Sequence, residues 1–183
     1  MNIETFDIQG PVLLTPRQFA DERGVFCETF RLHQIREAIG QDVEFVQENM
    51  SRSVKSGTVR GLHFQRAPAE QGKLVRCSRG RLRDVIVDLR RGSSTFAQHI
   101  AVVLDADSAS SFWVPSGFAH GFITLEDHCE ILYKTTDYYA PQHEGALFWA
   151  DPELGIDWGI SQADAIVSEK DKTAPSLSDL AQL

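Results

Sequence analysis

Short apolar segments separated by glycines make up most of the central part of the chain. They are rich in β-branched and aromatic residues, which favour strands over helices. The predicted strands lie within residues 73–80, 81–90, 99–105, 110–117 and 129–139, which read KLVRCSRG, RLRDVIVDLR, HIAVVLD, SSFWVPSG and CEILYKTTDYY. Several short strands at this spacing predict an all-β protein, and a jelly-roll barrel is the most economical architecture for them.

Helical periodicity is confined to short stretches that we expect at the periphery. In RLHQIREAIG, Leu32, Ile35 and Ile39 fall on one face of a helix, and Gly40 suits the position just after the last turn. A second short helix is expected in the C-terminal SLSDLAQL. No linker, repeat or low-complexity segment interrupts the chain, so we expect one domain over residues 1–183.

Alternation along one predicted strand indicates where polar side chains point. Between residues 82 and 89 one face is apolar, whereas the other carries Asp84, Ile86 and Asp88. One of these two faces is therefore expected to be wet or to line a polar cavity.

The stretch RGLHFQ, residues 60–65, places two polar groups in a segment that otherwise reads as a buried strand. In one interpretation, His63 is a hydrogen-bonded core histidine and Arg60 lies on the outer face. In the other, both side chains point into a cavity. Strict alternation puts them on opposite faces, so the second interpretation requires a bulge at Gly61.

Composition and charge exclude several classes of protein. The chain is 42% hydrophobic and 24% charged, which is ordinary for a soluble globular protein. It has no apolar run near the ~20 residues of a membrane span, and MNIETFDIQG lacks the features of a signal peptide. A cytoplasmic protein without membrane contact is expected. The net charge of −8 opposes binding to nucleic acid, but a small anionic ligand needs only a local cluster of cations.

The cysteines and histidines bear on metal binding. Cys27, Cys77 and Cys129 are far apart and show no C-x-x-C spacing, so they predict neither a disulfide framework nor a zinc site. Two motifs resemble those of the cupin family. TVRGLHFQRAPAE follows G-x5-H-x-H-x4-E from the preceding glycine to Glu70, with Gln65 in place of the second histidine, and PSGFAH follows P-x-G-x-x-H.

The glutamine argues against a metal site. A metal-dependent cupin oxygenase would use His63, Glu70 and His120 as ligands, but a neutral glutamine is a poor ligand for a transition metal. We therefore expect no metal and no other cofactor.

Seven stretches together resemble the dTDP-4-dehydrorhamnose 3,5-epimerase family along nearly the whole chain. In order they are DERGVFCETF, FVQENMSRS, TVRGLHFQ, GKLVRCSRGRLRDVIVDLRRGS, WVPSGFAHGF, YKTTDYYAP and SEKD. Each is weak evidence alone, but seven in the same order leave little room for coincidence. The resemblance implies a cupin-type jelly-roll barrel and epimerisation of a dTDP-linked 4-keto-6-deoxy sugar in dTDP-L-rhamnose biosynthesis.

The resemblance also implies a set of catalytic residues. Epimerisation beside a ketone needs a base on one face of the ring, an acid on the other, and a donor for the enolate oxygen. His63 fits the base, since histidine has an unperturbed pKa of about 6.5. Asp171 resembles the aspartate that orients the base, with Asp84 as a second candidate. Lys73 resembles the enolate-stabilising cation and Tyr133 the proton donor, although a turn lysine is usually solvated and a strand tyrosine usually half-buried.

The remaining motif residues resemble a nucleotide-diphosphate site. Arg23, Arg60 and Lys170 are expected to contact phosphate oxygens. The resemblance assigns base or sugar contacts to Glu28, Gln47, Asn49, His120 and Glu144, and stacking on the thymine to Tyr139, with Tyr138 as the alternative. It further implies a homodimer in which N-terminal strands cross to the partner and carry Arg23 and Glu28 with them.

Three other functions stay open from the sequence. Relatives that invert only C3 or only C5, or that take another nucleotide sugar, share the same motifs. A metal-dependent cupin oxygenase and a non-catalytic sugar-binding cupin belong to different classes. The joint presence of His63, Lys73, Tyr133 and Asp171 argues against the non-catalytic module.

Overall fold

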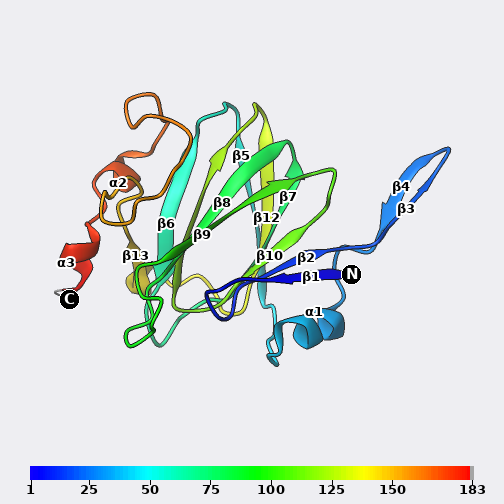
Figure 1. Ribbon diagram of the computed structural model, residues 1–183, viewed down its shortest axis with the longest axis horizontal. Helices are drawn as coiled ribbons and strands as arrows, with labels where there is room; N and C mark the ends of the chain where they lie inside the picture. Colours follow the sequence, from blue (N-terminus) through cyan, green and yellow to red (C-terminus); the bar gives the residue numbers. More distant parts are fainter. Residues whose placement is uncertain (182–183) are drawn as a thin grey trace.

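Two antiparallel sheets pack face to face in the computed structural model, which describes residues 1–181 (Figure 1). The first sheet consists, from edge to edge, of β1 (Asn2–Thr5), β2 (Val12–Thr15), β10 (Ser111–Val114), β7 (Lys73–Arg79), β12 (Cys129–Thr135) and β5 (Gln47–Ser53). The second consists of β13 (Glu144–Ala146), β6 (Val59–Gln65), β11 (Phe118–Thr124), β8 (Arg81–Asp88) and β9 (His99–Asp105). Most consecutive strands alternate between the sheets, as in a jelly roll, which confirms the predicted fold class.

The main core fills the space between these sheets. Val75 and Phe112 of the first sheet pack with Ile86 and Phe122 of the second, and each of the four is at most 6% exposed. Next to Val75 in β7, Leu74 packs on the opposite side with a different cluster, as the two-residue period of a strand requires. Burying one such side chain stabilises the folded state by roughly 1.5–3 kcal/mol. This core therefore fixes the positions of the two sheets and of the side chains that they carry.

The early helix forms where the sequence predicts it. Helix α1 (Leu32–Ile39) buries Ile35 and Ile39 against Trp113 and neighbouring residues of the first sheet. It ends at Gly40, whose φ of 65° lies in the left-handed region that glycine adopts without a steric cost. The amphipathic pattern and the terminating glycine are both confirmed.

Strand β8 departs from the expected pattern because both of its faces are covered. Val85 and Val87 pack beneath a cluster that includes Trp149 and Trp158, from the segment that follows β13. The other face points toward the main core, and its Asp84 is fully buried. Only the start of the strand, at Arg81, is exposed, so the buried carboxylates of Asp84 and Asp88 must be hydrogen-bonded inside the protein.

Short helices complete the C-terminal part, at the left of Figure 1. They are η1 (Pro141–His143), α2 (Glu169–Lys172) and α3 (Leu177–Ala181). Helix α3 lies in the predicted SLSDLAQL segment, whose last two residues fall outside the described part of the chain. Among the described residues, no helix is both long and apolar enough to cross a membrane.

A hairpin of β3 (Gln18–Asp21) and β4 (Gly24–Cys27) belongs to neither sheet. It projects away from the body at the right of Figure 1. Its apolar side chains face solvent, with Phe26 71% and Val25 61% exposed. Neither of these two side chains belongs to a hydrophobic core cluster of the described residues.

Candidate active site

A β-bulge in β6 brings Arg60 and His63 into the same space. On the neighbouring strand β11, His120 lies opposite His63 and Phe122 lies opposite Arg60, so three steps along β6 match two along β11. Gly61 stands at the bulge with φ of 124°, and a Cβ there would lie 2.8 Å from the His120 carbonyl oxygen. The interpretation with the two side chains on opposite faces is therefore wrong, and the bulge interpretation is confirmed.

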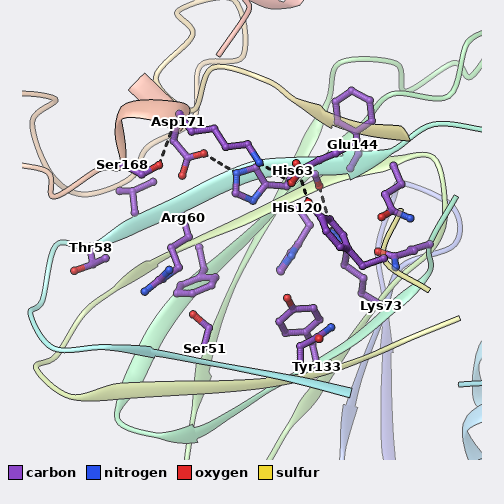
Figure 2. A pocket seen from close by; sticks show the side chains of 18 of the residues that line it. Ser51, Thr58, Arg60, His63, Lys73, His120, Tyr133, Glu144, Ser168 and Asp171 are labelled. Carbon is purple, nitrogen blue, oxygen red and sulfur yellow. Dashed lines mark hydrogen bonds and ion pairs between the residues drawn. The ribbon is translucent and has the colours of Figure 1, made fainter. Parts of the chain in front are cut away.

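Both side chains line a cavity of about 710 Å³ between the sheets (Figure 2). Its walls come from β5, β7 and β12 on one side and from β6, β11 and β13 on the other, with α2 at one end. Every predicted site residue except Arg23 and Glu28 lines it: His63, Lys73, Tyr133, Asp171, Gln47, Asn49, Arg60, His120, Tyr139, Glu144 and Lys170. Residues spread over more than 120 positions of sequence thus converge because the jelly roll interleaves its two sheets.

His63 and Asp171 form a close pair at the α2 end of the cavity. The His63 Nε2–H donates to Asp171 Oδ1 at 2.6 Å, and the Gly61 backbone N–H donates to Oδ2 at 3.3 Å. Burial is the largest single influence on the Asp171 pKa and raises it, since the residue is 3% exposed. The hydrogen bonds from His63, Gly61 and Ser168, together with the positive charge of His63, outweigh burial and hold the carboxyl pKa below its usual value. An ionised Asp171 keeps the proton on Nε2, which leaves the other ring nitrogen able to accept one.

Asp84, the second candidate for this role, pairs with a different histidine. Its carboxylate lies 2.9 Å from Nε2 of His120, and both groups are buried. Because β8 and β11 are neighbours and His120 lies opposite Ile86 in the ladder, Asp84 cannot also orient His63 on β6. The Asp84 alternative is wrong, and Asp171 is the partner of His63.

Lys73 and Tyr133 face the cavity from the first sheet. Figure 2 shows Tyr133 on the wall opposite His63. Burial lowers the pKa of Lys73 to about 8, although the negative charges of Asp84 and Glu144 counteract part of this effect. Burial also raises the pKa of the Tyr133 phenol. Neither side chain is in the solvated or purely packing role that its residue type would suggest, and at neutral pH both retain their protons.

Glu144 joins the rim of the cavity into one network. It accepts from Lys170 Nζ at 2.6 Å and from the Tyr139 hydroxyl at 3.2 Å. Burial raises and Lys170 lowers its carboxyl pKa, with a net shift below the usual value. Tyr139 lines the cavity, whereas the adjacent Tyr138 is not among its lining residues. The geometry therefore favours Tyr139 as the aromatic that can stack on a ligand.

Arg23 and Glu28 lie outside the cavity. Arg23 is at the tip of the β3–β4 hairpin with 89% of its side chain exposed, and it pairs with Asp21. Glu28 follows the hairpin and pairs with Arg31. Within a single chain neither residue reaches the cavity, so their contacts to the ligand stay a prediction that depends on a partner chain.

Three residues to which the sequence assigns no role in the site also support it. Ser168 caps α2 by accepting from the Asp171 backbone N–H at 3.2 Å, and the S-x-x-D pattern of SEKD is a recognisable signal for such a cap. Gln65 and Gln71 hold the loop that carries Tyr139. No sequence signal predicts this role, since it depends on side chain to backbone bonds between distant segments.

The residues proposed as metal ligands do not converge. Glu70 is exposed and borders a second cavity, which neither His63 nor His120 lines. His63 and His120 are each paired with their own aspartate. Among residues 1–181, no group of three His, Cys, Asp or Glu side chains could hold a metal ion.

The cavity of this jelly roll has a histidine–aspartate pair on one wall and a lysine and a tyrosine on the other. These features define a cupin-type acid–base enzyme. The model of the dTDP-4-dehydrorhamnose 3,5-epimerase family matches residues 5–179. The chain belongs to this family, whose members are isomerases acting on carbohydrates, and its reaction is an epimerisation in dTDP-rhamnose biosynthesis.

Individual relatives are similar to this chain in both sequence and structure. The dTDP-4-dehydrorhamnose 3,5-epimerase of Pseudomonas aeruginosa is 49% identical over 94% of this chain and 93% of its own length. The crystal structure of the Elizabethkingia anophelis enzyme superposes with a TM-score of 0.92 at 40% identity, covering 98% of this chain and 97% of that one. A Legionella pneumophila epimerase in complex with dTDP-4-keto-L-rhamnose gives 0.91 at 41% identity, covering 97% and 93%.

Proposed function

We propose that this chain inverts both C3 and C5 of dTDP-4-dehydro-6-deoxy-D-glucose, with His63 as the base and Tyr133 as the acid. The observation that carries this proposal is their placement on opposite walls of one cavity. Inversion at carbon needs a proton to leave from one face of the sugar and to return on the other. A single acid–base group would return the proton to the face from which it came.

The ketone at C4 makes the neighbouring C–H bonds acidic. His63 takes the proton from carbon, the electron pair moves into the carbonyl, and an enolate forms. Tyr133 then delivers its phenolic proton to the opposite face of the same carbon, and the carbonyl is restored. Solvent returns a proton to Tyr133 and removes one from His63, so the sequence can be repeated at the second carbon. Asp171 stabilises the imidazolium formed in the first step.

Lys73 is suited to stabilise the enolate oxygen. It is half-buried beside β6, with Nζ 3.4 Å from the His63 carbonyl oxygen, and its pKa of about 8 keeps it cationic at neutral pH. A cation in a partly desolvated cavity stabilises developing negative charge more strongly than one in water. His120, held by Asp84 on the same side, is proposed to contact the sugar ring.

The nucleotide is proposed to occupy the outer part of the cavity. Arg60 and Lys170 would contact the diphosphate, and Tyr139 would stack on the thymine. Gln47 and Asn49, hydrogen-bonded to each other at 2.8 Å, together with Glu144, would complete the contacts to base and sugar.

We also propose a homodimer in which the β3–β4 hairpin docks on the partner. A hairpin with 71% of Phe26 exposed gains apolar burial only by packing on another molecule. In that arrangement, Arg23 and Glu28 of one chain would reach the cavity of the other, where a nucleotide diphosphate would pair with Arg23.

The reaction is tested by incubating the protein with dTDP-4-dehydro-6-deoxyglucose in D2O and following C3 and C5 by NMR, with the next reductase added to trap product. Deuterium at both carbons and trapped L-rhamno product are expected. Deuterium at one carbon alone would make the chain a mono-epimerase, and binding without exchange would make it a non-catalytic module. Activity lost to a chelator and restored by one divalent ion would favour the metal-dependent alternative.

A further inference from the structure

The loop of residues 137–140 is held by three glutamine side chains that reach it from separate parts of the fold. We call this loop the tyrosine strap, because it carries Tyr138 and Tyr139 between β12 and η1. Gln71 Nε2 donates to the Asp137 carbonyl at 2.8 Å. The Tyr139 N–H donates to Gln47 Oε1 at 3.0 Å. Gln65 is the third glutamine, and all three line the cavity.

Gln65 makes the largest number of these contacts. Its Oε1 accepts from the Ala140 N–H at 2.8 Å, and its Nε2 donates to the carbonyl oxygens of Tyr138 at 3.2 Å and Ala69 at 2.6 Å. The residue is 8% exposed, so each of these groups would be costly to leave without a partner.

Only an amide can make this set of bonds. A glutamine offers one acceptor and two donor hydrogens, whereas a neutral histidine offers one of each and a glutamate accepts only. The residue that replaces the second histidine of the cupin motif is therefore engaged with backbone groups on the side of β6 toward the strap. This gives the departure from the motif a physical reason that is independent of metal binding.

The strap has no regular secondary structure, yet it keeps Tyr139 at the cavity with 54% of its surface exposed. A free loop would lose conformational entropy on ordering around a ligand, and that loss would weaken binding. Three amides hold successive backbone groups of the strap, and two of them, Gln47 and Gln65, stand on strands. The entropy cost is therefore met on folding and not on binding. Tyr139 is also restrained at its tip by the bond to Glu144.

We propose that Gln65, assisted by Gln71, is a positioning residue that preorganises Tyr139 for the planar base of the nucleotide. This inference rests on the proposed function, since it takes Tyr139 as the stacking surface. It assigns to Gln65 a part in nucleotide affinity and none in proton transfer.

The test compares Gln65→Leu with wild type by calorimetry, with dTDP and inorganic pyrophosphate as separate ligands. We expect the Kd of dTDP to rise about tenfold, within the range of base–aromatic stacking, and the Kd of pyrophosphate to stay within about twofold. Turnover at saturating substrate should also stay within about twofold. Equal weakening of both ligands would overturn the proposal, because it would indicate a general disturbance of the cavity.

A double-mutant cycle provides the sharper test. Tyr139→Ala alone should weaken dTDP about as much as Gln65→Leu does, and combining the two changes should add little, because the second residue acts through the first. Multiplying effects would show that Gln65 acts independently of Tyr139. Gln142→Leu, an exposed glutamine on η1, is the matched control and should bind dTDP like wild type.

A second variant covers the case in which Gln65→Leu fails to fold. Gln71→Leu removes the bond to Asp137 alone, and a rise of about threefold in the Kd of dTDP is expected. No change in this variant, if folded, would overturn the assisting role of Gln71. A wild-type protein that neither binds dTDP nor epimerises would refute the proposed function itself, whereas intact wild-type activity with unchanged variants would refute only the inference.

Discussion

The cavity and the β3–β4 hairpin carry residues of the same proposed site, but the fold treats them very differently. Most of the cavity residues stand on strands of the two sheets, which pair along ladders such as the seven residues of β5 with β12. These strands lie over a core whose side chains are almost fully buried. The hairpin pairs only its own two four-residue strands and exposes Phe26 and Arg23. The structure of the cavity is determined within a single chain, whereas the hairpin lies apart from both sheets of its own chain.

This contrast separates chemistry from binding. The groups proposed to move protons, together with Lys73, all lie in the region that one chain determines completely. The groups left on the hairpin and directly after it are Arg23 and Glu28, which suit contacts to phosphate and to base or sugar. Changes in the cavity should therefore reduce turnover, and changes in the hairpin should reduce affinity and depend on assembly.

The largest effect is expected from His63→Ala, which removes the proposed base. Proton transfer by a positioned group contributes roughly 10²–10⁴-fold, so turnover should fall by at least about a thousandfold, with no deuterium entering the substrate. NMR in D2O measures both. His33→Ala, an exposed histidine on α1, is the control and should match wild type. Near-normal turnover in His63→Ala would show that His63 is not the base. The proposal that the cavity holds the proton-transfer groups would then fail.

Tyr133→Phe should separate the two halves of the reaction. The ring keeps its packing and loses only the hydroxyl, so His63 can still form the enolate and return a deuteron to the original face. We expect exchange at C3 or C5 to persist while inverted product falls about a hundredfold. Full inversion at both carbons would mean that water or another side chain is the donor.

How far the sequence predicts this molecule depends on whether the signal is local. The strands, the α1 helix and its terminating Gly40 follow from short-range patterns, and the motif resemblance places the cavity residues together. The sequence leaves the partner of His63 open between Asp171 and Asp84, because only the pairing of β8 with β11 commits Asp84 to His120. The sequence does not show that both faces of β8 are covered, since the segment that buries one of them is remote in sequence.

The role of Gln65 illustrates the same limit. Its sequence position indicates only that a histidine is absent. Its bonds to Tyr138 and Ala140 arise from a loop more than seventy residues away, which no periodicity in the strand can show.

Arg23→Ala tests the proposed role of the hairpin in substrate affinity. Loss of one charged contact to phosphate typically costs about 1.5–3 kcal/mol, so KM should rise about tenfold or more with little change in turnover at saturation. Arg91→Ala, at the second cavity, serves as the control. An unchanged KM would contradict a role for Arg23 in any chain.

Mixing two variants asks which chain supplies the arginine. In a hybrid dimer of His63→Ala and Arg23→Ala chains, a hairpin that crosses to the partner would give one site with both residues intact. Activity at low substrate should then rise above that of either variant alone. If Arg23 serves its own chain, every site in the hybrid remains defective and no recovery appears.

The smallest effect concerns pH and again distinguishes the two regions. Burial lowers the pKa of Lys73 to about 8, so the cation is present below that pH and is lost as the pH rises through it. Turnover at saturating substrate should therefore fall several-fold between pH 7.5 and about pH 8.5. Arg23→Ala should show the same alkaline limb, because Arg23 is proposed to contact the diphosphate and not the enolate oxygen that Lys73 stabilises. Lys73→Arg should lack the limb even if its turnover is lower, since an arginine stays protonated in this range. An alkaline limb that persists in Lys73→Arg would assign the titration to another group and leave Lys73 without the charge-stabilising role.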